Sequence, residues 1–120
     1  MRRVTGIGGI IFTAKDPAVL QAWYKRHLGI DVQPWGGTAF TEPGTTIWSI
    51  GPAQGTQFAP STAPFMINYR VDDLIALVKV LREAGCNLHG DLQDSEYGKF
   101  GWVMDPEGNK VELWQPPAGQ

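Results

Sequence analysis

The chain has 120 residues, of which 42% are apolar, and its formal net charge at pH 7 is −2. A chain of this length forms one domain with a real core and is too short for two. Its ten Lys and Arg residues are scattered, which argues against a nucleic-acid-binding surface, and no apolar run is long enough to span a membrane. The single cysteine, Cys86, excludes an internal disulfide and indicates a reducing compartment, so we expect a cytoplasmic protein.

The first half of the chain predicts one helix among short strands. Residues 4–13 are rich in glycine and β-branched side chains and predict a buried strand. Asp16 as N-cap and Pro17 at the first helical position begin a helix, which Gly29 ends. Glycine and proline turns then separate three further predicted strands, at 30–33, 38–41 and 45–50.

The second half repeats this plan after a connection rich in Gly, Pro and Ser. A strand is predicted at 64–71, a helix between the capping pair Asp72-Asp73 and Gly85, a short strand at 86–89 and a polar loop at 90–98. Asp16 and Gly29 stand 56 residues before Asp72 and Gly85. The chain therefore predicts two modules of the same βαβββ order.

The second module ends in a predicted hairpin, FGWVMDPEGNKVELWQP, whose turn is DPEGN. Pairing across this turn sets Trp102 opposite Glu112 and Phe100 opposite Trp114. The side chains of a strand alternate between its faces, so these four share one face, while Val103 and Leu113 lie on the other. One face of the hairpin thus carries a lone carboxylate among aromatic rings, which indicates a ligand site.

Three segments resemble the vicinal oxygen chelate superfamily, which includes glyoxalase I, extradiol dioxygenases, fosfomycin-resistance enzymes and bleomycin-binding resistance proteins. They are KDPAVLQAWYKRHLGI at 15–30, YRVDDLIALVKVLREAGC at 69–86 and DPEGNKVELWQP at 105–116. The resemblance implies an α+β fold in which two βαβββ modules form a cup-shaped mixed β-sheet. Residues 1–120 would be one glyoxalase-like domain, with module one at about 4–50, a linker at about 51–63 and module two at about 64–116. It also implies a site inside the cup and a homodimer.

In the enzymes of that superfamily, the first and last strands of each module bind a divalent metal. Glu112 matches the carboxylate ligand of the last strand. The other three positions fall on Gly9, on Met66 or Phe65, and on Trp48 or Ser49. These residues bind hard or borderline divalent cations poorly or not at all, so we expect no metal and no cofactor. The two histidines, His27 and His89, lack the spacing of a metal site.

The resemblance also indicates which side chains line the cup. The candidate ligand-binding residues are Trp48, Met66, Asn68, Phe100, Trp102 and Trp114, with Tyr97 from the polar loop. Glu112 is the candidate catalytic residue, as a hydrogen-bond acceptor, a counter-charge or a general base. Structural alternatives stay open: the aromatic residues would serve equally in a core or a dimer interface, and Glu112 would pair with Lys110, Arg70 or a backbone donor.

Three functional hypotheses follow. The favoured one is a small-molecule-binding protein that holds an apolar or aromatic ligand without the usual metal, for sequestration or resistance or for metal-free catalysis by Glu112. The alternative is a divalent-metal-dependent lyase, isomerase or dioxygenase with non-standard ligands or ligands supplied across a dimer interface. The third is a small interaction module whose aromatic residues form the interface. The sequence decides neither the ligand nor whether a reaction is catalysed.

Overall fold

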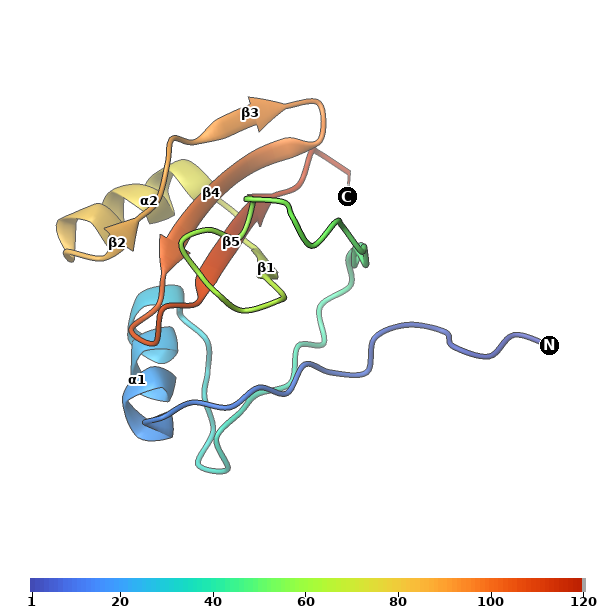
Figure 1. Ribbon diagram of the computed structural model, residues 1–120, viewed down its shortest axis with the longest axis horizontal. Coiled ribbons are helices and arrows are strands. Elements are labelled where there is room, and N and C mark those ends of the chain that lie inside the picture. The colour runs from blue at the N-terminus through green and yellow to red at the C-terminus, as the bar shows by residue number, and fades with distance from the viewer. Residues whose placement is uncertain (120) are drawn as a thin grey trace.

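The computed structural model describes residues 1–119, which form two helices and a mixed sheet of five strands (Figure 1). The elements are α1 (Pro17–Leu28), β1 (Ile67–Arg70), α2 (Leu74–Glu83), β2 (Asn87–Leu88), β3 (Gln93–Ser95), β4 (Gly98–Met104) and β5 (Lys110–Gln115). The strand order is β1-β5-β4-β2, with β3 also paired to β4; β1 is parallel to β5 and the other pairs are antiparallel. The predicted α+β class is confirmed, and the sheet is open rather than closed. None of the helices within residues 1–119 has the length and apolar character to cross a membrane.

Both helices begin and end at the residues that the sequence indicates. The Asp16 carboxylate accepts a hydrogen bond from the Val19 amide at 3.2 Å, and Gly29 ends α1 in the left-handed conformation. In α2 the Asp73 carboxylate accepts from the Ala76 amide at 3.1 Å. The helix boundaries were thus readable from local capping chemistry.

The second half of the chain has the predicted strand, helix and hairpin, with one correction. The predicted polar loop at 90–98 contains β3, which pairs with the start of β4. Gly98, at a φ of 113°, allows the tight reversal between the two strands. Strands β2 and β3 therefore lie along the same edge of β4 as two pieces of one interrupted strand.

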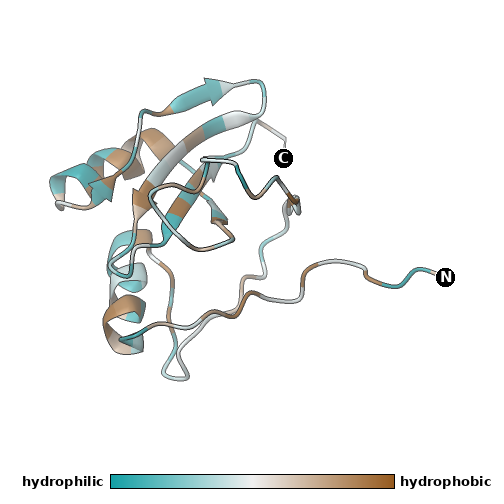
Figure 2. Cartoon of the chain, viewed as in Figure 1, coloured by the Kyte–Doolittle hydropathy of each residue, from teal (hydrophilic) through white to brown (hydrophobic). Residues whose placement is uncertain are grey.

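The four strands predicted in the first half, at 4–13, 30–33, 38–41 and 45–50, are not strands in this structure. A strand requires a neighbouring backbone edge, and these segments instead run as extended or turning chain. Residues 1–13 leave the body as an arm with apolar segments along it (Figure 2). The Ile11 side chain on this arm is 94% exposed, and Ile47, in the segment 45–50, is 68% exposed.

The sheet has two faces of different character. Val103, Val111 and Leu113 lie on one face and are at most 1% exposed, in a core shared with α1 and α2. The opposite face carries the predicted pairs Trp102–Glu112 and Phe100–Trp114, which are confirmed by the register of β4 and β5. The hairpin thus separates the core from a second, chemically mixed face.

A buried carboxylate in the β4–β5 turn attaches α1 to this hairpin. Asp105 is 5% exposed and accepts the Tyr24 hydroxyl at 2.8 Å, the Glu107 and Asn109 amides at 2.9 Å each, and the Asn109 side chain at 2.8 Å. Burial and the bond to Asp105 raise the pKa of Tyr24 above its usual range, so the phenol stays a neutral donor. Glu107 adds a second attachment, because its carboxylate accepts the Lys15 and Asp16 amides at 2.8 and 3.0 Å, which lower its pKa.

We predict that Asp105→Ala destabilises the protein by about 3 kcal/mol, since it leaves the buried Tyr24 hydroxyl and the turn amides without their acceptor. Tyr24→Phe removes one of these bonds and should cost about 1–2 kcal/mol. Urea unfolding measures both. Asp94→Ala, on the exposed strand β3, is the matched control and should change stability by less than about 0.5 kcal/mol. An Asp105→Ala protein as stable as this control would contradict the assignment.

Candidate ligand-binding site

The mixed face of the sheet carries a half-open pocket of about 310 Å³. Strand β4 contributes Trp102 to it, β5 contributes Lys110 and Glu112, and the residue before β1 contributes Met66. The remaining lining residues come from the linker, from the chain between β2 and β3 and from the start of β3: Gln57, His89, Gly90, Asp91 and Gln93. The pocket therefore combines an indole ring and a thioether with several polar side chains.

The carboxylate of Glu112 is held by a neutral neighbour on the adjacent strand. Asn68 on β1 stands opposite Glu112 in the parallel register, and its side-chain amide donates to Glu112 Oε2 at 3.2 Å. The sequence left open a pairing of Glu112 with Lys110 or Arg70. In the structure, both of those cations bind backbone carbonyls elsewhere.

Lys110 fastens the linker across the pocket. Its ammonium donates to the Gln57 carbonyl at 2.8 Å and stands 5.7 Å from the centre of the Trp102 ring. A cation at this distance from an indole is attracted by the negative face of the ring. Lys110 thus joins the pocket floor to the loop above it.

Arg70 holds a segment of the first half in a similar way. Its guanidinium donates to the Thr45 carbonyl at 2.6 Å. A side chain at Gly44 would meet that guanidinium at 2.6 Å, so the end of the Arg70 side chain would have to shift to admit it. Two cations on the mixed face therefore hold backbone of the first half and of the linker against the sheet.

The structure brings together some of the predicted ligand-binding residues and separates others. Met66, Trp102 and Glu112 line the pocket, and Asn68 touches it through Glu112. Trp114 is 7% exposed; it stacks on Phe100 with ring centres 6.2 Å apart and donates its indole N–H to the Tyr97 carbonyl. These two rings pack against each other beside the pocket. The side chains of Tyr97 and Trp48 are 69% and 72% exposed and do not line it.

Sequence reasoning missed six pocket residues, of which His89, Asp91 and Lys110 carry the most chemistry. The His89 amide donates to the Trp102 carbonyl at 2.9 Å, so the pairing of β2 with β4 extends one residue beyond Leu88. An antiparallel register drawn from the hairpin through β2 would have placed His89 beside Trp102. The signal was present, but it depended on a pairing between distant segments.

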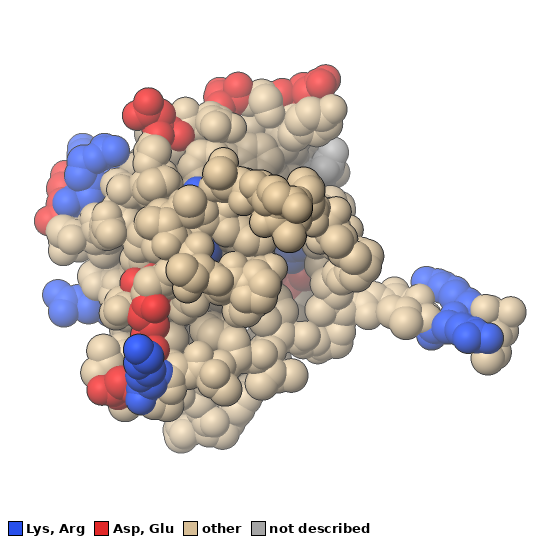
Figure 3. All heavy atoms as spheres, viewed as in Figure 1, with Lys and Arg blue, Asp and Glu red and all other residues tan. Residues whose placement is uncertain are grey.

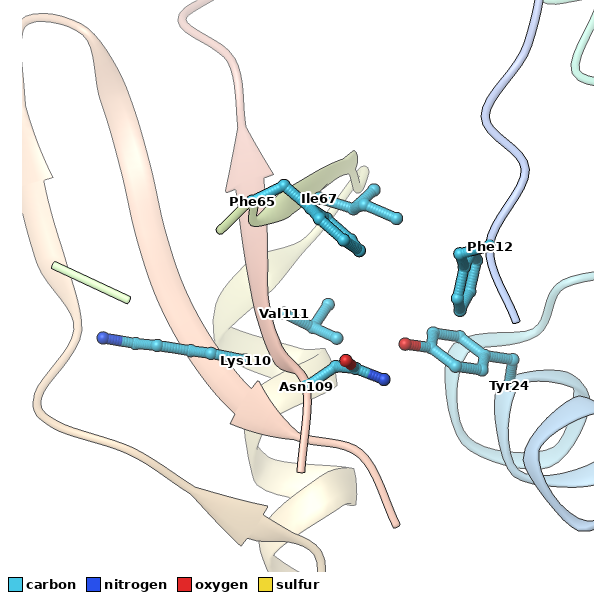
Figure 4. A pocket seen from close by; sticks show the side chains of 7 residues that line it. All are labelled: Phe12, Tyr24, Phe65, Ile67, Asn109, Lys110 and Val111. Atoms are coloured by element: carbon cyan, nitrogen blue, oxygen red, sulfur yellow. The ribbon is translucent and has the colours of Figure 1, made fainter. Parts of the chain in front are cut away.

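A smaller pocket lies on the other side of β5 (Figure 4). Phe12 from the arm faces the Tyr24 ring there, with ring centres 6.3 Å apart, while the Lys110 side chain points away to the mixed face. At about 10 Å³ this pocket has room for one water molecule. It marks where the arm is anchored to the body and is too small for an organic ligand.

The residues of the larger pocket do not fit a divalent metal. Within residues 1–119, no three His, Cys, Asp or Glu side chains lie together in a way that could hold a metal ion. The positions that the resemblance assigns to the family's other ligands hold Gly9, Met66 or Phe65, and Trp48 or Ser49, and the one carboxylate that remains, Glu112, supplies too few donors.

Comparison with known proteins places this fold. Among solved structures, the chain is similar to TnmS3, an antibiotic binding protein from Streptomyces sp. CB03234, with 19% identity, a TM-score of 0.63, and coverage of 98% of this chain and 100% of the other. A glyoxylase/bleomycin resistance protein/dioxygenase domain from Frankia sp. EAN1pec gives 17% identity, a TM-score of 0.62, and coverage of 98% and 96%. The oxidase ChaP-H2 gives 18% identity, a TM-score of 0.56, and coverage of 89% of this chain and 90% of the other.

At these identities the solved structures establish the fold alone. The search of curated proteins found no match. The model of the glyoxalase-like domain, however, matches residues 9–114, which is most of the chain, and this confirms the resemblance seen in the sequence. The chain belongs to the glyoxalase-like domain family.

Proposed function

We propose that this protein binds a small aromatic molecule in the pocket on the mixed face of the sheet. The observation that carries the proposal is the position of the Trp102 indole and the Met66 thioether beside the Glu112 carboxylate, around a volume of about 310 Å³. That volume is at the small end of organic ligand sites, which suits a ligand of two or three fused rings. The similarity in fold to an antibiotic binding protein supports a role in sequestration or resistance.

The three residues have separate roles in this proposal. The indole of Trp102 stacks on the ligand ring, and the flexible thioether of Met66 fills the space beside it. Glu112 accepts a hydrogen bond from a polar ligand group through Oε1, because Asn68 holds Oε2 and orients the carboxylate. If the protein catalyses a reaction, Glu112 is its general base. We place the protein in the cytoplasm, since its single cysteine suits a reducing compartment.

Acridine at pH 8, where it is a neutral three-ring compound, probes the site by titration calorimetry. Trp102→Ala should weaken its binding at least tenfold, about 1.4 kcal/mol, because the stacking surface is lost. Glu112→Gln should weaken a hydroxylated acridine more than acridine itself. Trp35→Ala is the matched control, since Trp35 is 73% exposed and does not line the pocket. Equal binding by wild type and Trp102→Ala would place the site elsewhere.

The competing function is metal-dependent catalysis, in which some of the metal ligands would be supplied by a second chain across a dimer interface. Untagged protein is incubated with zinc, nickel, manganese or ferrous iron, desalted and analysed for its elements. We expect less than a tenth of an equivalent per chain, because within residues 1–119 no three donor side chains lie close enough together to hold a metal ion. Retention near one equivalent, lost in Glu112→Gln, would make the protein a metalloenzyme and overturn the proposed metal-free site.

We also propose that the protein is a homodimer in which a second copy covers the first half. A compact monomer of 120 residues exposes about 6,400 Å², whereas this chain exposes 9024 Å². The difference, roughly 2,600 Å², exceeds the ~800 Å² that each partner of a standard interface buries. The face seen in Figure 3 carries most of its charged atoms at the rim and at the tip of the arm and few at its broad centre.

Sedimentation equilibrium should give twice the chain mass. Ile11→Lys should weaken the dimer at least tenfold, since it places a charge on a side chain that is 94% exposed in one chain but covered in two. Val80→Lys, on the outer side of α2 where Val80 is 58% exposed, is the control and should leave the dimer intact. A monomeric wild type at millimolar concentration, or a dimer unchanged by Ile11→Lys, would contradict this arrangement.

A further inference from the structure

We infer that the pocket selects a planar aromatic ligand that carries a positive charge, an inference that rests on the proposed function. It concerns the charge of the ligand, which the aromatic lining alone leaves undetermined. The pocket is lined by two carboxylates, one ammonium group and the ring of Trp102.

The charges that line the pocket are unequal. Asp91 and Glu112 contribute two carboxylates, and Lys110 contributes one ammonium. The hydrogen-bond partner of Glu112 is the neutral amide of Asn68, which orients the carboxylate without neutralising it. A ligand cation would meet negative charge here, and a ligand carboxylate would meet repulsion.

Lys110 marks the place where a cation is stable in this pocket. Its ammonium stands 5.7 Å from the centre of the Trp102 ring and donates to the Gln57 carbonyl at 2.8 Å. The same ring face that attracts this ammonium attracts the positive charge of a ligand stacked on it. Lys110 and a cationic ligand therefore compete for one face.

Displacement of Lys110 has a structural consequence. The Lys110 bond holds the linker at Gln57, and Gln57 itself lines the pocket. A cationic ring that takes the face of Trp102 releases this bond and allows the linker to move away from the opening. The linker thus acts as a cover that Lys110 holds over the pocket. A positively charged ligand opens this cover most effectively, because it competes directly with the Lys110 ammonium.

Three probes with the same ring system and different charge test the inference at pH 8: 9-aminoacridine as the cation, acridine as the neutral ring and acridine-9-carboxylate as the anion. We expect 9-aminoacridine to bind at least tenfold more tightly than acridine, and the carboxylate most weakly. Added salt should reduce the difference between the charged probes, because it screens these half-exposed charges.

Variants assign the preference to particular residues. Asp91→Asn and Glu112→Gln should each shrink the preference for 9-aminoacridine over acridine, and Lys110→Met should enlarge it by removing the competing ammonium. Asp94→Asn, on exposed strand β3 and outside the pocket, is the matched control and should leave the preference unchanged. Circular dichroism and urea unfolding verify that each variant folds.

Two results would overturn the inference alone. They are equal affinity of wild type for acridine and 9-aminoacridine, or a preference that survives in both Asp91→Asn and Glu112→Gln; in either case an aromatic binding site still stands. No binding of any of the three probes would contradict the proposed function as well.

Discussion

The fold depends on one buried carboxylate, Asp105, in the turn between β4 and β5. It accepts four hydrogen bonds, three from within the turn and one from the Tyr24 hydroxyl on α1, which lies 81 residues away in the sequence. A buried carboxylate is costly unless its oxygens are satisfied, so the turn and the helix are stable in this arrangement only together. The same bonds that close the hairpin therefore attach the first half of the chain to the second.

The hydrogen bonds of Asp105 also affect the pocket, because they fix the register of the strands that line it. A turn held by Asp105 fixes which residues of β4 and β5 stand opposite each other, and Trp102 then faces Glu112. A slip of β4 by one residue would turn Trp102 into the core face and bring Val103 out of it, and the same slip of β5 would exchange Glu112 and Leu113. Burial of Val103 and Leu113 opposes such a slip, because both are fully buried against the helices. Ligand chemistry on one face thus depends on packing on the other.

Local chemistry was readable from the sequence, and long-range pairing was not. The caps Asp16 and Asp73 and the hairpin register follow from short-range rules, and all three are confirmed. The first-half strands were wrong because an apolar, β-branched segment is a strand only when another backbone edge lies beside it. Trp48 was placed in the cup from the same missing strand. His89 and Asp91 were missed because their place beside Trp102 depends on the pairing of β2 and β3 with β4. No local sequence motif predicts that pairing.

The mixed face of the sheet is partly covered by chain that precedes β1, held there by Arg70 and Lys110. We propose that aromatic ligands stack on Trp102 in this face. Two-dimensional ¹H–¹⁵N NMR resolves the indole N–H of each of the five tryptophans, so a titration with acridine tests this directly. We predict that the Trp102 signal shifts most and that the Trp35 signal stays in place. A Trp102 signal that stays in place while that of Trp48 or Trp114 moves would contradict the account.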